Sequence, residues 1–341
     1  MTDRATETID QDALWRLVAA ALTAHGASAA QAHAVATTVT SAERDGSHSH
    51  GIFRVAGYVA SLKSGKVDGK AVPKVSHPAP AAVVVDAGNG FAPMALAVGT
   101  PQLVKTARIA GVAVLAVRRV FHFAALWHEV EAIADESLIA IACTAATPMV
   151  APAGGGRAFF GTNPLAYAVP RAEGPPLVVD QASAAMARGD IMMAAEAGRS
   201  VPAGVGLDAA GRPSTDPAAI LAGAQLPFGG YKGSAIALLV EMLAGAAIGE
   251  CFSDEAGARD NGDGGPPVGG EFLLAIDPEA LGAGEDWRAR VGDYLDRLLA
   301  IEGTRLPGAR RHANRAMIGD GPLTVDAARL AVLRRLAGGS P

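Results

Sequence analysis

The stretch Gly46–Arg54, "GSHSHGIFR", gathers ionisable side chains in a chain otherwise rich in alanine, valine and glycine. If a helix begins near Ser49, then His50 and Arg54 are four residues apart and share one face. An imidazole exchanges protons near neutral pH, and a guanidinium binds a carboxylate through two parallel hydrogen bonds. The pair therefore suits a small anionic substrate that changes its proton count. The structural alternative is a solvated helix start capped by a serine.

Two glycine-rich turns are further candidates for ligand binding. They are "GGGRAFFGTNP" at 154–164 and "PFGGYKG" at 227–233. Glycine lets a ligand approach the backbone closely, and Lys232 would stand at the start of the next helix, where free N–H groups also attract anions. Taken singly, each turn is better explained as an ordinary glycine-containing loop.

The segment "RLPGARRHANR", 305–315, contains four arginines and one histidine but no acid. Pro307 and Gly308 predict a turn here, in which several guanidinium groups could converge on one phosphate. The alternative is a basic loop that is simply solvated.

Two kinds of predicted region must position these residues: an N-terminal helical region and a following region of alternating strands and helices. Helices are expected over 10–25, with Asp10 as N-cap, over 28–44, and from about Ser49 onward, forming an N-terminal helical layer. Short β-branched runs then indicate buried strands; they lie at 81–86, 112–117, 138–145, 164–170, 176–180 and 271–276. Further helices are expected at 93–109, 125–136, 183–197, 232–249, 287–301 and 324–337. This is α/β texture, and 253–270 is expected to be a mobile Gly/Asp/Pro loop.

Composition narrows the class of protein. The 341 residues allow about two domains. The formal net charge of −5 argues against a nucleic-acid binder, which needs a basic face. Charged residues are only 18% of the chain and mean hydropathy is +0.24, which favours extra burial in an oligomer interface. An alanine-rich proteome would give the same figures.

The chain's ends and cysteines indicate a cytoplasmic protein. The N-terminus is polar and unlike a signal peptide, and the apolar runs are interrupted too early to span a bilayer. Cys143 and Cys251 have neither disulfide nor zinc spacing. No strand leads into G-x-G-x-x-G, and the phosphate-binding P-loop is absent as well.

Taken together, the motifs resemble the malate/L-lactate dehydrogenase family of the non-Rossmann type. They are "SHG" with Arg54, "FHFAALW" at 121–127, "FFGTNPLAYAVPR" at 159–171 and "FGGYKGSAIALLVEMLAG" at 228–245. They occur in the family's order along nearly the whole chain. Within the family, "HFAALW", "SAAMARGD" and "RLPGARRH" are most similar to the Δ1-piperideine-2-carboxylate/Δ1-pyrroline-2-carboxylate reductases, which reduce cyclic imino acids with NADPH.

The resemblance implies a fold and an assembly. We expect an α/β protein with a mixed, largely antiparallel sheet and flanking helices, a non-Rossmann NAD(P)-binding fold, plus a helical domain built from both chain ends. The implied division is 1–78 joined by 302–341 for the helical part, and 79–301 for the cofactor and substrate part. A cytoplasmic homodimer is expected, with no nucleic-acid or membrane partner and no metal.

The resemblance also implies roles for particular residues. Ser49, His50 and Asp190 would form a catalytic relay, and Arg54 and Thr162 would bind the substrate. The residues expected to bind NADPH are His122, Phe123, Ala124, Ala125, Leu126, Asp180, Gln181, Ala182, Tyr231, Lys232, Arg305, Leu306, Pro307, Gly308, Ala309, Arg310 and Arg311.

Two departures from the family pattern bear on these roles. Tyr231 stands where the family usually has histidine before the lysine of "GGHKG". The "GGGRAFFG" loop lacks the bulkier polar residues often found there, which leaves the substrate size open.

The expected function is NADPH-dependent reduction of Δ1-pyrroline-2-carboxylate and Δ1-piperideine-2-carboxylate to L-proline and L-pipecolate. The alternative within the family is a 2-oxo acid/2-hydroxy acid dehydrogenase acting on malate, lactate or a related acid. A catalytically silent dimer that senses imino or amino acids is a third reading, against which Ser49, His50 and Asp190 argue.

Overall fold

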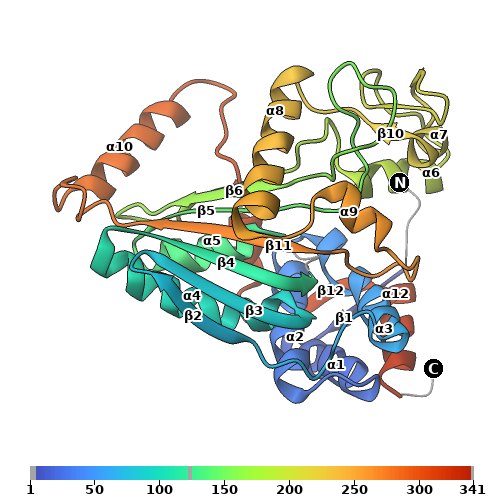
Figure 1. Ribbon diagram of the computed structural model, residues 1–341, viewed down its shortest axis with the longest axis horizontal. Coiled ribbons are helices and arrows are strands. Elements are labelled where there is room, and N and C mark those ends of the chain that lie inside the picture. The colour runs from blue at the N-terminus through green and yellow to red at the C-terminus, as the bar shows by residue number, and fades with distance from the viewer. Residues whose placement is uncertain (1–4, 122–124, 339–341) are drawn as a thin grey trace.

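A seven-stranded mixed sheet forms the centre of the protein, in a computed structural model that describes residues 5–121 and 125–338 (Figure 1). Its strand order is β2-β3-β4-β11-β5-β6-β7, and among the described strands only β3 and β4 pair in parallel. The strands are β2 (Lys74–Ala79), β3 (Ala82–Phe91), β4 (Val112–Phe121), β5 (Ile139–Thr144), β6 (Leu165–Val169), β7 (Leu177–Gln181) and β11 (Val268–Ile276). The predicted mixed, largely antiparallel sheet is confirmed.

Two helices cover one face of the sheet and close the main core. Helices α4 (Ala92–Ala110) and α5 (Trp127–Asp135) pack against β3, β4, β5 and β6. The β-branched and leucine side chains of the strands interlock with them in one buried cluster that includes Val85, Leu115 and Leu273. The strand predictions succeed because short β-branched runs fit the buried strands of such a sheet.

A second layer combines both ends of the chain. It contains α1 (Gln11–Ala24), α2 (Ala29–Arg44), α3 (Val55–Ser64) and α12 (Ala327–Leu336), which lie together below the sheet in Figure 1. Asp10 caps α1 as expected, and Ser28 caps α2; each side chain accepts a backbone N–H in the first turn. Strands β1 (Thr6–Ile9) and β12 (Leu323–Asp326), not predicted from the sequence, pair antiparallel and join the two ends.

Three sequence predictions need correction in or near this layer. The third helix does not begin at Ser49: two 3-10 turns, His48–His50 and Ile52–Arg54, precede α3. The basic segment is not only a turn, because Ala309–Ile318 forms helix α11 after Gly308. The last helix begins at Ala327 rather than 324, because β12 occupies the preceding residues. The division at residue 78 stays a prediction; β2 spans that residue.

The upper part of the molecule holds short elements around one apolar helix (Figure 1). They are α6 (Arg188–Glu196), α7 (Pro217–Ala222), the small sheet of β8 (Gly206–Leu207), β9 (Pro213–Ser214) and β10 (Ala224–Gln225), and α9 (Ser253–Ala258). Helix α10 (Trp287–Leu299) projects from the opposite end of the sheet. The predicted helix 232–249 is α8 (Tyr231–Val240), followed by a π turn (Glu241–Gly245) and a 3-10 turn (Ala246–Ile248).

Within the described residues, Tyr231–Ile248 is long and apolar enough to cross a membrane by length and composition, a test that core helices also pass. Glu241 lies in its middle, buried, and accepts hydrogen bonds from Asn163 Nδ2 (2.7 Å) and Ser253 N (2.9 Å). Because these bonds tie the stretch to neighbouring loops, it is an integral part of this fold.

The predicted loop 253–270 begins with helix α9 and is held against α3. Lys66 Nζ lies 2.5 Å from Asp263 Oδ1 and 3.3 Å from Asp260 Oδ1. The hydroxyls of Ser61 and Ser64 donate to Asp263 Oδ2 at 3.0 and 2.8 Å. This segment therefore has a fixed anchor that its Gly/Asp composition does not suggest.

Candidate active site

The turn that carries the predicted catalytic residues, here called the catalytic turn (His48–Arg54), is internally bonded. Ser49 Oγ lies 3.0 Å from His50 Nδ1, within hydrogen-bond distance. Arg54 Nε donates to the carbonyl oxygen of Ser49 at 2.6 Å. Ser49 thus contacts both His50 and Arg54 across two 3-10 turns, and the two residues do not share one helix face.

Arg54 occupies a partly desolvated position beside aromatic rings. Burial lowers its pKa to about 10, with Tyr58 acting to raise it and Arg329 to lower it. The guanidinium carbon lies 5.2 Å from the centre of the Phe53 ring. Arg54 therefore remains cationic at neutral pH, where a carboxylate would bind it more strongly than in bulk water.

Helix α6 brings Asp190 toward this turn from the other part of the molecule. A Cβ atom added at Gly189 would lie 3.5 Å from Ser49 Cβ, so the first turn of α6 packs directly on Ser49. Asp190 lies in that same first turn. Ser49 and the segment of Asp190 are therefore neighbours although 140 residues separate them; the relay from Asp190 to His50 stays a prediction.

Thr162 lies beside the strand end that carries Asp180. Its carbonyl oxygen accepts the Ser183 N–H at 2.7 Å, and Asn163 follows with the left-handed value φ = 37°. Asn163 is buried and held by Glu241, which fixes the backbone on which Thr162 stands. The conformation explains why this turn needs an asparagine, a residue that tolerates positive φ.

The segments predicted to bind the cofactor converge. Asp180 Oδ2 accepts the Trp127 N–H at 3.0 Å, which brings Leu126 and its neighbour Ala125 next to the stretch Asp180–Ala182. The carbonyl of Ser183 accepts the Phe228 N–H at 3.0 Å and so brings in the turn before α8. Tyr231 and Lys232 are exposed there. His122, Phe123 and Ala124 lie outside the described residues.

The basic segment Arg305–Arg315 contacts strand β7. Arg311 Nη2 donates to the carbonyl of Val178 at 3.4 Å, and its guanidinium carbon is 5.4 Å from the Trp127 ring centre. Burial lowers the pKa of Arg311, while Asp180 and the acids nearby raise it. Arg305 and Arg310 are exposed. The segment therefore joins the group formed by Leu126 and Asp180.

Behind these residues lies a pair of buried carboxyl groups that the sequence did not suggest. Burial raises the pKa of Glu129 to about 7; a hydrogen bond with Glu271 lowers it and the charge of Asp180 raises it. Glu129 follows Trp127 by two residues on α5, while Glu271 belongs to β11. The lone acidic residue in the middle of a strand, "GGEFLLAI", was the available signal.

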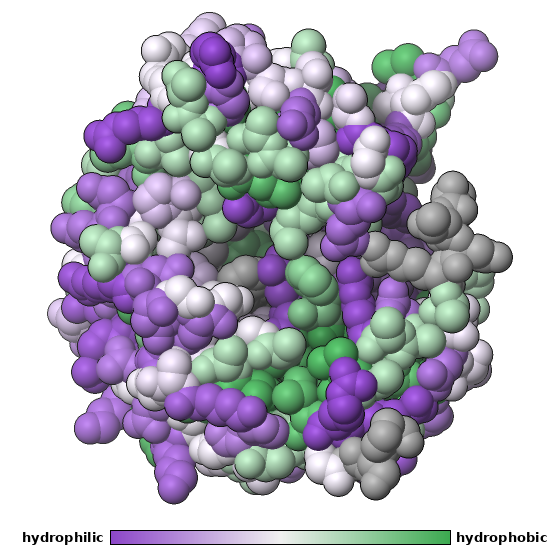
Figure 2. Space-filling model, turned by 90° about the vertical axis from the view of Figure 1, so that its right-hand side faces the viewer, coloured by the Kyte–Doolittle hydropathy of each residue, from purple (hydrophilic) through white to green (hydrophobic). Residues whose placement is uncertain are grey.

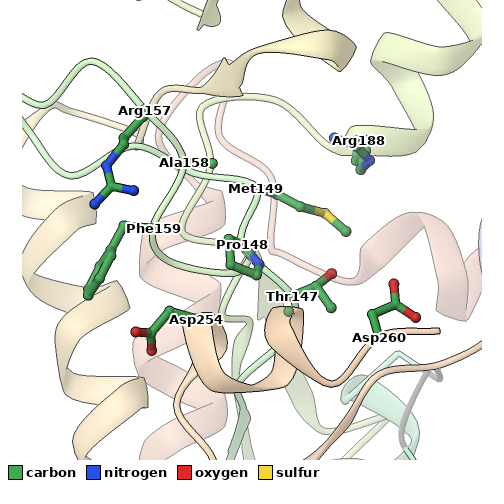
Figure 3. A pocket seen from close by; sticks show the side chains of 10 residues that line it. Thr147, Pro148, Met149, Arg157, Ala158, Phe159, Arg188, Asp254 and Asp260 are labelled. Atoms are coloured by element: carbon green, nitrogen blue, oxygen red, sulfur yellow. The ribbon is translucent and has the colours of Figure 1, made fainter. Parts of the chain in front are cut away.

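A cavity of about 590 Å³ opens beside α6 (Figure 3). Arg188 lines it from the residue before Gly189, and Arg157, Asp254 and Asp260 lie around it, with Phe159 at one side. Figure 2 shows the molecule hollowed between its upper and lower parts. Arg188 was missed from the sequence, although it is two residues from Asp190 in "ARGD". Among the described residues no group of three or more His, Cys, Asp and Glu could hold a metal ion.

The sequence matches the family described as malate/L-lactate dehydrogenase over residues 9–334. The chain belongs to the malate/L-lactate dehydrogenase family. Within it, a Δ1-pyrroline-2-carboxylate/Δ1-piperideine-2-carboxylate reductase of Pseudomonas syringae pv. tomato is 44% identical over 337 residues, covering 98% of each chain. A protein of the same name from Pseudomonas aeruginosa is 46% identical over 301 residues, covering 88% of this chain and 90% of its own.

Solved structures of the malate/L-lactate dehydrogenase family agree with this fold. The crystal structure of Δ1-piperideine-2-carboxylate reductase from Pseudomonas syringae superposes with a TM-score of 0.93 at 44% identity, covering 97% of this chain and 100% of that one. Sulfolactate dehydrogenase from Methanocaldococcus jannaschii gives 0.87 at 29% identity and 98% coverage of both. The resemblance inferred from the motifs is therefore confirmed.

Proposed function

We propose that this protein reduces Δ1-pyrroline-2-carboxylate and Δ1-piperideine-2-carboxylate to L-proline and L-pipecolate, with NADPH as the preferred cofactor. One observation carries the proposal: the bonded turn from Ser49 to Arg54 packs on the first turn of α6 in a chain 44% identical to reductases named for these substrates. The enzyme is an NAD(P)H-dependent oxidoreductase that acts on a C=N bond.

The residues of the chain have separable tasks in this reaction. Arg54 binds the substrate carboxylate, and Thr162 contacts the substrate from the neighbouring turn. His50, held by Ser49, controls the proton on the ring nitrogen, and Asp190 orients the imidazole. A nicotinamide cofactor, when bound, would supply the hydride for the carbon of the C=N bond. The substrate iminium already carries positive charge, so the protein's contribution is orientation, anion binding and proton control.

The residues present fit a phosphorylated dinucleotide. Arg305 and Arg310 are exposed and, within residues 5–121 and 125–338, no ion pair involves them. Lys232 is also exposed at the start of α8, where backbone N–H groups favour anions. A 2′-phosphate carrying nearly two negative charges would be stabilised beside such guanidinium groups, which supports NADPH over NADH.

The proposed assembly is a homodimer in the cytoplasm. Leu238, Leu239 and Met242 on α8 and the following turn are between 42% and 50% exposed, an apolar surface that a second copy would cover. Both cysteines are free and buried, as suits a reducing compartment. Light scattering of the purified protein at several concentrations tests the dimer.

A steady-state panel tests the function. Purified protein would be assayed with NADPH and with NADH against Δ1-pyrroline-2-carboxylate, Δ1-piperideine-2-carboxylate, oxaloacetate and pyruvate. We expect the highest kcat/KM for the imino acids with NADPH. A higher kcat/KM for a 2-oxo acid would favour the second candidate function, that of a 2-hydroxy acid dehydrogenase. The structural similarity to sulfolactate dehydrogenase supports this second candidate.

A further inference from the structure

Glu43 is a buried acid directly beneath the catalytic turn. It belongs to the last turn of α2, and its side chain is 3% exposed. Glu43 Oε2 lies 2.6 Å from His48 Nδ1, and Oε1 accepts the N–H of Ile52 at 2.8 Å. One carboxylate therefore holds the residues on both sides of the Ser49–His50 pair.

The packing of this carboxylate accounts for the glycine in "SHG". A Cβ atom at Gly51 would lie 2.0 Å from Glu43 Oε1 and 2.5 Å from Glu43 Cδ. Gly51 has φ = −88° and ψ = −142°, and this ψ lies outside the regions that residues with a side chain prefer. Glycine is therefore favoured twice, by this backbone conformation and by a carboxylate so close that no side chain fits between them.

The same carboxylate controls the charge of His48. Its hydrogen bond raises the pKa of His48, against burial and against the positive charges of Arg329 on α12 and Arg310 on α11. These are the charged groups that face the ring from α2, α12 and α11. The ion pair with Glu43 thus favours the imidazolium form of His48 in a surrounding that otherwise opposes it.

We propose that Glu43 is a positioning residue for catalysis: by binding the His48 ring and the Ile52 N–H together, it sets the orientation of Ser49, His50 and Arg54 toward the substrate. The inference rests on the proposed function and adds a residue that touches no reacting atom. Misplacing a catalytic group by about 1 Å can cost about 10²-fold in rate, so the effect is expected in kcat.

The experiment uses the full-length protein with Glu43→Gln, Glu43→Ala and a control, Asp277→Asn. Glutamine keeps the shape and one acceptor but loses the charge, whereas alanine removes both contacts. Asp277 is also a buried, paired carboxylate, 2.9 Å from Arg108, but at the other end of β11 from the site. Circular dichroism and thermal unfolding report folding, and NMR titration reports the pKa values of His48 and His50.

We expect kcat for imino acid reduction to fall about 10-fold in Glu43→Gln and about 100-fold in Glu43→Ala, with KM for NADPH within about twofold. The pKa of His48 should fall in Glu43→Gln, and Asp277→Asn should keep wild-type kcat. If Glu43→Ala does not fold, the kcat and the His48 titration of Glu43→Gln alone test the proposal.

Wild-type kcat in folded Glu43→Gln, or an unchanged His48 titration, would overturn the proposal; so would an equal loss in the control. If the wild type reduces no imino acid, the proposed function fails separately. The two histidine titrations then still decide whether Glu43 organises this turn.

Discussion

The two ends of the basic segment Arg305–Arg315 use the same residue type in opposite ways. At one end, Arg315 Nη2 lies 2.5 Å from Asp45 Oδ2 and 2.7 Å from Glu131 Oε2, both buried carboxylates. Burial lowers the pKa of Arg315, but the hydrogen bonds that Arg315 donates to both acids outweigh it and raise the pKa. At the other end, Arg305 and Arg310 are exposed. An arginine that is paired with buried acids stabilises the fold. An exposed arginine without such a partner is available to bind a ligand.

The largest expected effect is the loss of turnover when the proposed acid–base residue is removed, and it should leave the basic segment unaffected. His50→Ala should lower kcat by at least about 100-fold, because positioned acid–base groups contribute roughly 10²–10⁴. KM for NADPH should stay near the wild-type value, since the basic segment is untouched. Steady-state kinetics with the preferred imino acid measure both. Near-normal turnover would assign the proton transfer to another group.

The next effect concerns the acid-bound end. Arg315→Ala leaves Asp45 and Glu131 buried without this cation, and removing one partner of a buried pair typically costs about 3 kcal/mol or more. The free energy of unfolding, measured in urea, should fall by about 3 kcal/mol. The matched control, Arg310→Ala, should stay within about 0.5 kcal/mol of wild type, as exposed substitutions do. Equal losses would contradict the contrast between the two ends.

The exposed end should show its effect in cofactor binding. Hydrogen bonds to charged groups contribute about 1.5–3 kcal/mol each, so Arg305→Ala with Arg310→Ala should raise KM for NADPH by about 10-fold or more. KM for NADH should change by less than about twofold. Arg311→Ala should affect both cofactors, because its side chain also packs on Trp127. If the double variant loses both cofactors equally, this segment is not the phosphate site.

The smallest expected effect concerns the stability that Asp263 gives to the loop after α9, where its carboxylate is bonded to Lys66, Ser61 and Ser64. Burial raises the pKa of Asp263, but hydrogen bonds from Lys66, Gly265, Ser64 and Ser61 lower it to about 2. The ionised carboxylate therefore stabilises the fold above the unfolded pKa of about 4, and this stability is lost as pH falls toward 2.

Asp263→Asn should accordingly reduce the free energy of unfolding by about 1–2 kcal/mol at pH 7. The difference between variant and wild type should shrink as pH falls from about 4 to about 2. Urea denaturation across that range measures it. A difference that stays constant down to pH 2 would show that the carboxylate's charge does not stabilise the segment.

The sequence allowed most of the sheet and the cap of α1 to be predicted because their signals are local. β-branched runs gave six of the seven strands of the central sheet, and Asp10 marked the start of the first helix. Strand β2 was not predicted, because its residues are exposed and form no apolar run. Strands β1 and β12 were not predicted, because each is four residues long and pairs with a strand more than 300 residues away in the sequence. Arg315 and Asp45 are 270 residues apart, so no spacing could indicate that pair.

The site shows the same limit. Spacing placed His50 and Arg54 on one helix, whereas the structure has two 3-10 turns that meet at Gly51, against which the Glu43 carboxylate packs. The motifs nevertheless named segments that the structure brings together, because family resemblance carries three-dimensional information that periodicity lacks. Glu129, Glu271 and Arg188 were missed, since single charged residues in apolar runs have no pattern of their own.

The pairing of β1 with β12 has a consequence for how the enzyme is made. The catalytic turn emerges from the ribosome early, yet its layer is closed by Leu323–Asp326 and α12, whose Arg329 lies 4.6 Å from the Phe53 ring centre. Until those residues are synthesised, the apolar faces of α1 and α3 lack their cover. Nascent chains therefore carry the proposed catalytic residues long before their layer is complete, and need protection from aggregation during that interval.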